Sequence, residues 1–495
     1  MNILMASSES LPFSKTGGLA DVIFSLSKEF VKLKNNVSIV LPKYKTNKVI
    51  KGVKLNKIFQ FDVKMNWRII PTSVYHCYYL GIDFYFIENQ KYFERDNLYG
   101  YYDDGERFAY FTNAVVKLIA SLPYKIDIVH LHDHQVGLLP CVIKTLYSDK
   151  EIYKGIKYVL TIHNPEFKGY FSKDSLYDFY NLPINLYDEG KIRLDEQVST
   201  LKAGIVFSDK ITTVSPTHAK ELLTYEGSKG LNYDLNLRKN DFVGILNGMD
   251  NDFFNPRTDT YIYKNYGIKD ALKGKNENKT EFCKKYNLDP KLPLFAIVSR
   301  LSSQKGIELL YPMVEFLSYT GGNIALIGSG EKGIEDKFLQ LGRVNNKHIF
   351  IYIGYNEELA HKVYASSDFL LMPSSFEPCG LSQMIAQKYG SLPIVRKTGG
   401  LKDTVNCYDL SDEEKKAKDI IKDGFGFDNY SISEAILTCA KAMNLYNGRK
   451  DVYKKMVINA MKLNHTWDES ARIYIALYES INNSSVYKKV AEEVA

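Results

Sequence analysis

The sequence KTGGL occurs twice in this chain, at residues 15–19 and again at residues 397–401. Each copy follows a short apolar run and precedes a stretch that can be helical, so each predicts a strand, a glycine turn and a helix start. Backbone N–H groups in the first turn of a helix lack intrahelical partners and carry the positive end of the helix dipole, which favours a phosphate. Two such sites predict two similar domains that hold one anionic ligand between them.

The length and composition agree with two globular domains. A chain of 495 residues is too long for one hydrophobic core and suits two domains of roughly 200–250 residues each. The formal net charge of +6 is small for this length, and the basic residues form no stripe, so we expect no nucleic-acid partner. No stretch approaches ~18 consecutive apolar residues, so we expect no membrane span.

The six cysteines are scattered, without a CxxC pair or a regular spacing. This distribution is typical of free thiols in a reducing compartment. The N-terminal sequence MNILMASSES has no basic leader, and its apolar run is too short for a secretion signal. We therefore expect a cytoplasmic protein.

Three alternating histidines, His130, His132 and His134, lie along a predicted strand. We expect His130 and His134 to share one face and His132 to point to the other. No carboxylate or cysteine stands at a convincing spacing to complete a metal site, so we expect no metal. Asp250 and Asp252 resemble an acidic metal pair, but they lie in a turn-rich stretch, which favours turn chemistry.

Short β-branched runs alternate with helical stretches through both halves of the sequence. The predicted strands of the first half are Met1–Ala6, Val37–Leu41, Ile126–Leu131, Tyr158–Ile162 and Lys210–Val214. Those of the second half are Leu294–Val298, Asn323–Ile327, His348–Ile353, Phe369–Met372 and Leu392–Val395. Helices are predicted at Ile307–Leu317, Leu381–Tyr389 and Trp467–Ile481, and the last could pack on either half.

The pattern breaks into Gly, Asn, Asp and Pro at residues 243–256, which predicts the interdomain connection. The fold class is therefore α/β, with two doubly wound, Rossmann-like domains at residues 1–245 and 246–466.

The candidate chemistry follows the predicted strands, where open parallel sheets bind their ligands. These residues are Lys15, Gly17, Gly18, Asp133, His163, Asn164, Arg300, Lys305, Glu377 and Cys379. The three cations can neutralise charge on a departing diphosphate, and one well-placed donor in such a site is worth roughly 10²–10³ in rate. Glu377 and Asp133 can accept hydrogen bonds from sugar hydroxyls. The set favours transfer from a phosphorylated sugar, although each residue alone also fits a solvated surface or a helix start.

Taken together, the motifs resemble the bacterial and plant glycogen and starch synthases, which are retaining glucosyltransferases that use ADP-glucose. The resemblance spans nearly the whole chain. It is carried by KTGGLADV (15–22), HLHDHQVGLLP (130–140), TIHNPEFKGYF (161–171), GILNGMDNDFFNP (244–256), SRLSSQKG (299–306), IGYNEELAHKVYASSDFLLMPSSFEPCGLSQ (353–383) and PIVRKTGGLKDTV (393–405). It implies the GT-B architecture, with the active site in the interdomain cleft and a final helix, about residues 467–482, that joins the N-terminal domain.

The resemblance also implies a role for each matched residue. Lys15 and Gly18 would contact the donor diphosphate, and Arg300 and Lys305 would stabilise the leaving ADP. Glu377 would contact the transferred glucose, His163 would bond its hydroxymethyl group, and Asp133 would line the reacting centre. Tyr355 would stack on adenine. The other residues assigned to the substrate are Gly17, Asp21, Asn164, Asn247, Cys379, Gly380, Leu381, Thr398, Gly399 and Gly400.

The implied reaction transfers glucose to the end of an α-1,4-glucan without a metal or another cofactor. Retention would follow from attack on the same face, with a diphosphate oxygen as the base. The chain departs from the family at Asp133-His134-Gln135, where the family usually has Asp-Trp-His, in a region that the acceptor would contact. Three alternatives stay open: a related enzyme with UDP-glucose or another acceptor, a phosphorylase-type enzyme with pyridoxal phosphate, and a glucan-binding scaffold without turnover.

Overall fold

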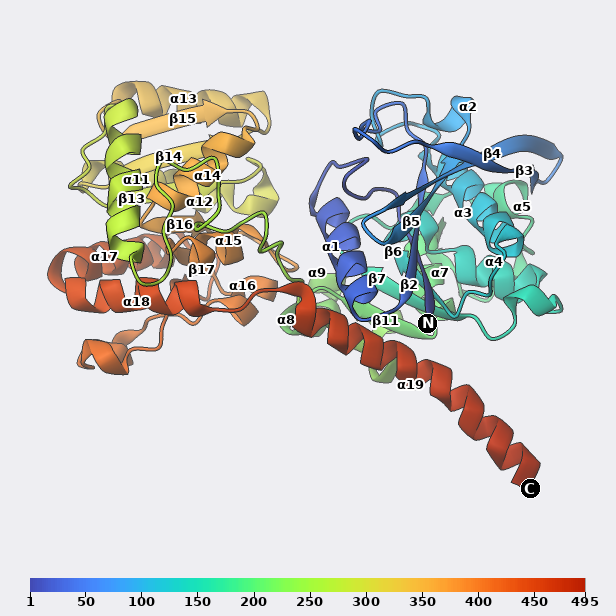
Figure 1. The fold of residues 1–495 in the computed structure, drawn as a ribbon. Helices are drawn as coiled ribbons and strands as arrows, with labels where there is room; N and C mark the ends of the chain where they lie inside the picture. The colour runs from blue at the N-terminus through green and yellow to red at the C-terminus, as the bar shows by residue number, and fades with distance from the viewer. Residues whose placement is uncertain (495) are drawn as a thin grey trace. The chain divides into compact units, whose positions relative to one another are not determined.

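The computed structural model of the protein describes the backbone of residues 1–494 and the side chains of these residues other than 410 and 483–494. The chain forms two compact units (Figure 1). Unit 1 consists of Met1–Asn247 together with the segment from Trp467 onward, and unit 2 consists of Gly248–Thr466.

Unit 1 is built on a nine-stranded sheet in the order β12-β11-β7-β6-β1-β2-β5-β4-β3. Its strands are β1 (Asn2–Ala6), β2 (Asn36–Pro42), β3 (Asn56–Met65), β4 (Arg68–Tyr79), β5 (Ile82–Glu88), β6 (Ile128–His132), β7 (Lys157–Ile162), β11 (Lys210–Thr213) and β12 (Phe242–Gly244). All neighbours from β12 to β5 pair in parallel, whereas β4 pairs antiparallel with both β5 and β3. The strand order reverses between β6 and β1, so a ligand crevice is expected at the carboxyl ends of these two strands.

The helices of unit 1 cover both faces of this sheet. The longer ones are α1 (Gly18–Lys32), α3 (Asp104–Ser121), α4 (Leu139–Leu146), α7 (Thr200–Phe207) and α19 (Trp467–Val494). The shorter ones are α2 (Gln90–Phe93), α5 (Ser175–Tyr180), α6 (Asn185–Asp188), α8 (Pro216–Leu222), α9 (Tyr225–Ser228) and α10 (Asn232–Leu237). A small antiparallel sheet joins β8 (Tyr170–Phe171), β10 (Gln197–Ser199) and β9 (Arg193–Leu194).

Strand β1 shows why the sheet needs helices on both sides. Ile3 and Met5 lie in one buried cluster with residues of α1 and α19, whereas Leu4 and Ala6 lie in a second cluster with residues of α3. Successive side chains of a strand point to opposite faces, so a strand that is apolar throughout has to be covered twice. In α1, Ile23, Leu26 and Phe30 recur at helical spacing and supply the covering face.

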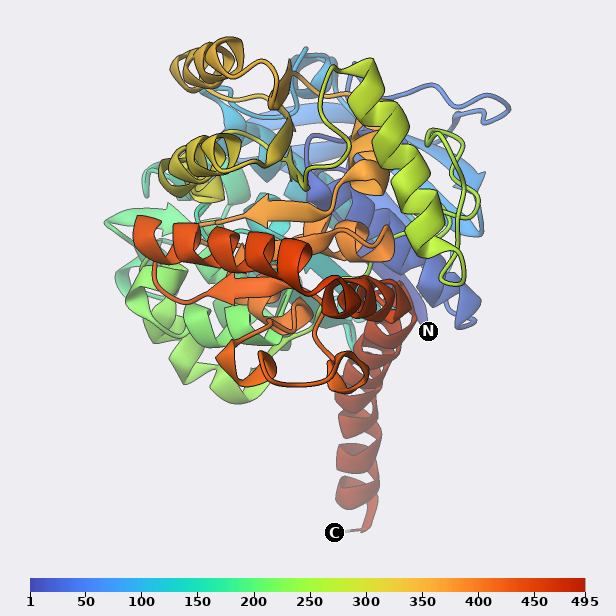
Figure 2. The same cartoon turned by 90° about the vertical axis from the view of Figure 1, so that its left-hand side faces the viewer.

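Unit 2 is built on a six-stranded parallel sheet in the order β15-β14-β13-β16-β17-β18. Its strands are β13 (Leu294–Val298), β14 (Asn323–Gly328), β15 (Ile349–Ile353), β16 (Phe369–Met372), β17 (Leu392–Arg396) and β18 (Phe425–Phe427). Its helices are α11 (Ala271–Lys285), α12 (Ile307–Tyr319), α13 (Lys332–Val344), α14 (Glu357–Ser366), α15 (Ser382–Lys388), α16 (Gly399–Thr404), α17 (Ile432–Gly448) and α18 (Lys450–Lys462), and they lie on both sides of the sheet (Figure 2). The strand order reverses between β13 and β16, which predicts the ligand crevice of this unit.

The predicted fold class is confirmed, and each predicted strand coincides with an observed one to within two residues at either end. The sequence analysis did not predict β3, β4 and β5. Strand β3 lies at the edge of the sheet, and its exposed positions interrupt the apolar run on which the prediction depended. The last predicted helix extends further, to Val494.

Candidate active site

The first KTGGL copy forms the loop between β1 and α1, at the point where the strand order of unit 1 reverses. A buried carboxylate holds this loop: Glu9 Oε2 accepts hydrogen bonds from Thr16 N at 2.5 Å and Thr16 Oγ1 at 2.9 Å. Glu9 is only 2% exposed, and burial raises its pKa above the ordinary value. Gly17 precedes α1 without a side-chain cap. The N-cap residue therefore provides no side-chain oxygen to accept hydrogen bonds from the N–H groups in the first turn of α1.

Lys15 stands on the outer side of this loop. Its side chain is 37% exposed, and its Nζ lies 2.9 Å from Asp21 Oδ1 in the first turn of α1. An ion pair this exposed contributes little to stability, so Lys15 can exchange Asp21 for another anion at small cost. Gly17 and Gly18 are exposed beside it. The loop brings together Lys15, Gly17, Gly18 and Asp21, all predicted from the sequence.

The ends of β6 and β7 bring Asp133 and His163 together. Asp133 Oδ1 accepts the backbone N–H of His163 at 2.7 Å and that of Asn164 at 3.4 Å. Asp133 has φ 60° and ψ −167°, a region that residues other than glycine rarely adopt and that is enriched at functional sites. Burial raises the pKa of Asp133 to about 7 and lowers that of His163 to about 3. His163 is therefore a neutral hydrogen-bonding group at physiological pH.

The expectation that His132 faces away from His130 was wrong. Their ring centroids are 4.1 Å apart, so both rings lie on one face of β6. Residues two apart in a strand share a face, whereas only consecutive residues alternate. His134 lies beyond the strand, in the short 3₁₀ helix His134–Val136. The prediction for Asp250 fits the structure, because its Oδ1 accepts the N–H groups of Asp252 and Phe253 in a turn.

Asp133 gives a prediction about pH. Its folded pKa of about 7 lies above the ~3.9 of an unfolded aspartate, so its contribution to stability is full below about pH 4 and is lost as pH rises through 7. The shift corresponds to a loss of up to about 4 kcal/mol. Asp133→Asn keeps an oxygen acceptor but does not titrate, so we expect the wild type to lose stability relative to this variant between pH 4 and 7.

Urea unfolding followed by tryptophan fluorescence measures this effect. The two tryptophans, Trp67 and Trp467, both belong to unit 1 and so report on the unit that contains Asp133. A difference in unfolding free energy that stays constant from pH 4 to 8 would contradict the assignment.

In unit 2 the central feature is the pair Lys305–Glu377. The loop after β13 carries Lys305 in the 3₁₀ helix Ser303–Lys305, and the loop after β16 carries Glu377. Lys305 Nζ lies 2.6 Å from Glu377 Oε2, which also accepts a hydrogen bond from Ser374 Oγ at 3.0 Å. Glu377 is 5% exposed. The pair lies at the strand ends where the order of the sheet reverses, so cation and carboxylate are held at the expected ligand crevice.

The second KTGGL copy packs directly on the Glu377 loop. Gly399 has φ 44°, and a Cβ atom there would lie 2.0 Å from the carbonyl oxygen of Glu377. A Cβ atom at Gly400 would lie 2.2 Å from the carbonyl oxygen of Cys379. Gly400 N donates to Glu377 O at 3.1 Å. The glycines are therefore required so that the backbone of residues 398–400 can approach the backbone of residues 377–379.

The other predicted residues of unit 2 surround this contact. Arg300, after β13, is exposed and makes no hydrogen bond or ion pair with another residue that the structure describes. Gly380 has φ 78°, and Leu381 immediately precedes α15. Thr398 immediately precedes α16. Tyr355, after β15, is 73% exposed.

Two further predicted residues of unit 1 are asparagines: the side chain of Asn164 has a local partner, and the side-chain oxygen of Asn247 has none in the described part of the chain. Asn164 Oδ1 accepts the N–H of Glu166 at 3.0 Å, so this side chain shapes its own turn. Asn247 is 8% exposed, and its buried Oδ1 has no partner among the residues that the structure describes. An unpaired buried amide oxygen is unfavourable and favours a donor from a ligand.

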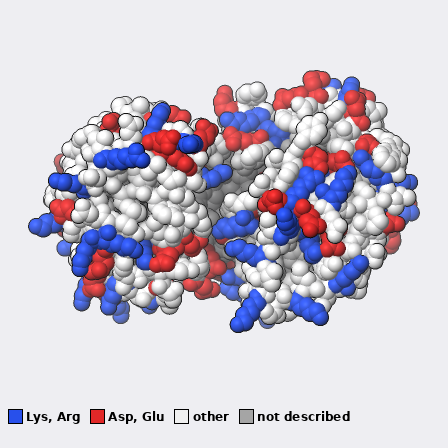
Figure 3. Space-filling model, turned by 90° about the horizontal axis from the view of Figure 1, so that it is seen from above, with Lys and Arg blue, Asp and Glu red and all other residues white. Residues whose placement is uncertain are grey.

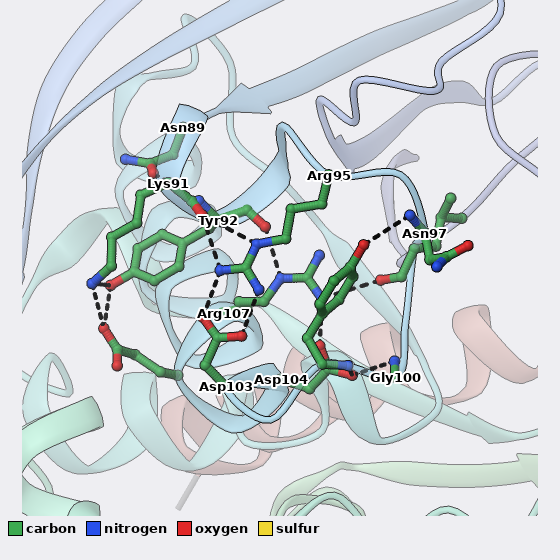
Figure 4. A network of polar contacts seen from close by, with 12 residues as sticks. Asn89, Lys91, Tyr92, Arg95, Asn97, Gly100, Asp103, Asp104 and Arg107 are labelled. Atoms are coloured by element: carbon green, nitrogen blue, oxygen red, sulfur yellow. Dashed lines mark hydrogen bonds and ion pairs between the residues drawn. The ribbon is translucent and has the colours of Figure 1, made fainter.

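Sequence reasoning missed a polar network between α2 and the start of α3 (Figure 4). Arg107 of α3 is fully buried, pairs with Asp104 and donates to the carbonyl oxygens of Tyr92 and Leu98. Arg95 Nη1 and Nη2 each lie 2.6 Å from a carboxylate oxygen of Asp103. The network holds the segment between α2 and α3. The only local signal was the density of charged residues at 94–107, which a solvated loop would also show.

On the face shown in Figure 3, basic and acidic side chains are interspersed. Among the described residues, no group of three or more His, Cys, Asp or Glu side chains is placed to hold a metal ion. In the same part of the chain, no helix is both long and apolar enough to span a membrane. All six cysteines are free thiols, as predicted.

Comparison with known proteins agrees with both units. Residues 2–237 match the family model described as starch synthase catalytic domain, and residues 278–456 match that of glycosyl transferases group 1. The chain is 40% identical to the glycogen synthase of Clostridium kluyveri, over 97% of this chain and 100% of the relative. It is 38% identical to the glycogen synthase of Streptococcus mutans, again over 97% of this chain and 100% of the relative.

Solved structures give the same result. The catalytic domain of starch synthase IV from Arabidopsis thaliana, bound to ADP and acarbose, superposes with a TM-score of 0.89 at 33% identity, covering 97% of this chain and 99% of that chain. Sucrose-phosphate synthase from Thermosynechococcus elongatus, at 15% identity and a TM-score of 0.60, shares the fold. Two α/β units, each built on a largely parallel sheet, define a GT-B glycosyltransferase together with these matches. Within that class, the chain belongs to the glycogen and starch synthase family.

Proposed function

We propose that this enzyme transfers glucose from ADP-glucose to the non-reducing end of an α-1,4-glucan, with retention of configuration. The observation that carries the proposal is the Lys305–Glu377 pair, held at the strand-order reversal of unit 2 and packed against the second glycine loop. Its support comes from membership of the family and from the relative that was solved with ADP and acarbose. We assign the donor to unit 2 and the glucan to unit 1.

The chemistry that the protein supplies is charge neutralisation at the leaving group. As the glycosidic bond to the diphosphate breaks, negative charge grows on the phosphate oxygens. Arg300 and Lys305 would meet this charge with two cations, and the backbone at residues 398–400 would add N–H donors. Lys15 would contribute a further cation from unit 1. Cations already in place stabilise the transition state without reorganisation, which is why such groups are worth orders of magnitude in rate.

The sugar is held by neutral and negative groups. Glu377 would accept hydrogen bonds from glucose hydroxyls and stabilise the positive charge of an oxocarbenium-like transition state. Because burial keeps His163 neutral, it would bond the hydroxymethyl group without adding charge. Asp133 would line the reacting centre, Asn247 would pair its free amide oxygen with the sugar, and the exposed ring of Tyr355 would stack on the base. No side chain is assigned as a nucleophile, so a diphosphate oxygen would take the proton of the attacking hydroxyl on the same face.

The test is incorporation of labelled glucose into glycogen from ADP-glucose and from UDP-glucose, assayed side by side with the purified enzyme. We expect incorporation mainly from ADP-glucose, and release of the label by an α-1,4-specific exoglucosidase. Stacking on Tyr355 does not discriminate strongly between bases. Faster transfer from UDP-glucose would therefore change the assigned donor and leave the proposed mechanism unchanged. Glycogen binding without incorporation from either donor would reject the proposed reaction in favour of a scaffold.

Two further observations bear on the remaining alternatives. A phosphorylase-type enzyme carries pyridoxal phosphate. A near-ultraviolet absorbance band of the purified protein would therefore favour a phosphorylase-type function over the proposed glucosyl transfer. The six free thiols support a reducing location, and we propose that the reaction takes place in the cytoplasm.

A further inference from the structure

Three histidines lie in contact at the carboxyl end of the unit 1 sheet. His130 and His132 of β6 are fully buried, with ring centroids 4.1 Å apart. His132 Nδ1 lies 3.0 Å from Nε2 of His163, which follows β7 and is partly exposed. The pair His132–His163 therefore connects the interior of the sheet to the residue that we assign to the sugar.

All three rings are neutral at physiological pH. Burial lowers the pKa of His130 to about 3 and that of His163 to about 3, and it lowers the pKa of His132 well below its ordinary value. A neutral imidazole has one nitrogen that donates and one that accepts. In the hydrogen bond between His132 and His163, one ring must therefore donate and the other must accept.

The surroundings of His132 decide which ring donates. Its second nitrogen, Nε2, is buried and has no hydrogen-bond partner among the described residues. An unpaired buried N–H group is rarer and less favourable than an unpaired acceptor. The proton of His132 is therefore on Nδ1, which donates to Nε2 of His163. His163 then carries its own proton on Nδ1.

We propose that His132 is a positioning residue that fixes His163 as the Nδ1–H tautomer, so that His163 offers a neutral N–H donor to a hydroxyl oxygen of the transferred sugar. The proposal rests on the role assigned to His163 under the proposed function. Nδ1 of His163 makes no hydrogen bond to any other residue that the structure describes, so it is available to a ligand. His132 itself is buried and acts only through His163.

The His132 ring packs against the ring of His130, which has hydrogen-bond partners at both nitrogens. Nδ1 of His130 lies 2.7 Å from Tyr478 Oη of α19, and Nε2 lies 2.6 Å from Thr161 Oγ1 of β7. Thr161 Oγ1 in turn lies 2.6 Å from Thr212 Oγ1 of β11. Groups from three elements, α19, β7 and β11, thus fix the plane of His130, and the His132 ring that packs against it at an interplanar angle of 38° has little freedom to rotate.

The first experiment observes the tautomer directly. The enzyme is labelled with ¹⁵N-histidine, and a long-range ¹H–¹⁵N spectrum separates Nδ1–H from Nε2–H rings among its nine histidines. His163→Asn assigns the resonances of His163. We expect the Nδ1–H tautomer in the wild type. An Nε2–H tautomer would overturn the proposal whatever the enzyme's activity, so this readout is independent of the proposed function.

The second experiment compares replacements of His132. In His132→Asn the amide nitrogen can replace the Nδ1–H donor, whereas His132→Phe supplies a ring of similar size without a donor. We expect His132→Phe to lower kcat by about 10- to 100-fold, as for loss of one positioned hydrogen-bonding group, with little change in the KM for the donor. His132→Asn should recover kcat to within a few-fold of the wild type.

Controls separate positioning from structural damage. His76→Asn, on β4, serves as the matched histidine replacement, because the His76 side chain contacts Asp83 and Tyr85 of the neighbouring strand β5 and lies outside the histidine cluster. Tryptophan fluorescence reports whether unit 1 remains folded in each variant. If His132→Phe keeps both the wild-type kcat and the wild-type tautomer of His163, the proposal fails. If that variant does not fold, the spectrum of the wild type still decides.

Discussion

Replacing Glu377 with Gln is expected to lower kcat by about 10²–10³, because this removes the carboxylate that we propose stabilises the developing positive charge of the sugar. The amide oxygen of Gln can still accept from Lys305 and Ser374, so the local hydrogen bonds remain. The loss should therefore appear in turnover more than in folding. The measurement is kcat at saturating ADP-glucose and glycogen, together with the thermal unfolding of the variant.

A matched control lies at the other end of the same strand. Asp368 immediately precedes β16 and forms a buried pair with Lys279 at 2.6 Å, as close as the Lys305–Glu377 pair. Asp368→Asn removes a buried charge far from the carboxyl end of the sheet, so it should lower stability and leave kcat nearly unchanged at temperatures where the variant is folded. A Glu377→Gln enzyme with normal kcat would remove Glu377 from the mechanism.

Replacing Lys15 with Ala is expected to lower kcat/KM for ADP-glucose by about 10², because this removes a cation that we propose neutralises charge on the leaving group. The unfolding free energy should change by less than about 1 kcal/mol, since the Lys15–Asp21 pair is exposed. The activity is measured over a range of ADP-glucose concentrations. Unfolding is followed by tryptophan fluorescence, which reports on unit 1.

Helix α1, which follows the Lys15 loop, provides the control for Lys15. Lys32, in the last turn of α1, is 62% exposed and lies 2.7 Å from Glu29 Oε1. Lys32→Ala also removes one lysine charge, at the end of α1 that lies away from the Lys15 loop, and we expect it to retain wild-type kcat/KM. Equal losses in the two variants would show that Lys15 acts through the overall charge of unit 1 and not at the diphosphate.

The elements that show a local sequence pattern could be predicted from the sequence. The core strands are short apolar runs, and the catalytic candidates follow them directly, so Asp133, Arg300 and Glu377 could be placed at strand ends without a structure. The edge strand β3 alternates exposed and partly buried positions with lysines on its outer side, so it gave no apolar run to recognise. Local periodicity identifies buried parallel strands better than exposed antiparallel ones.

Contacts between distant residues could not be predicted. Tyr478 and His130 are hydrogen-bonded although they are 348 positions apart in the sequence, and the sequence around either residue gives no indication of the other. Glu9 was not among the residues singled out from the sequence, although its carboxylate holds the first glycine loop. The strained backbone of Asp133 also arises only in the folded chain, from the partners that fix its amide and its carboxylate.

The position of α19 has a consequence for how the protein is made. This helix contributes Trp467, Tyr474 and Tyr478 to the cluster that covers one face of the unit 1 sheet, yet the ribosome synthesises it after all of unit 2. At ~5–20 residues per second, the nascent unit 1 waits roughly 10–45 s with the part of that face that α19 later covers still exposed. During translation the second unit can thus complete its core before the first, and the bare face of the first is the surface that a ribosome-associated chaperone would have to protect.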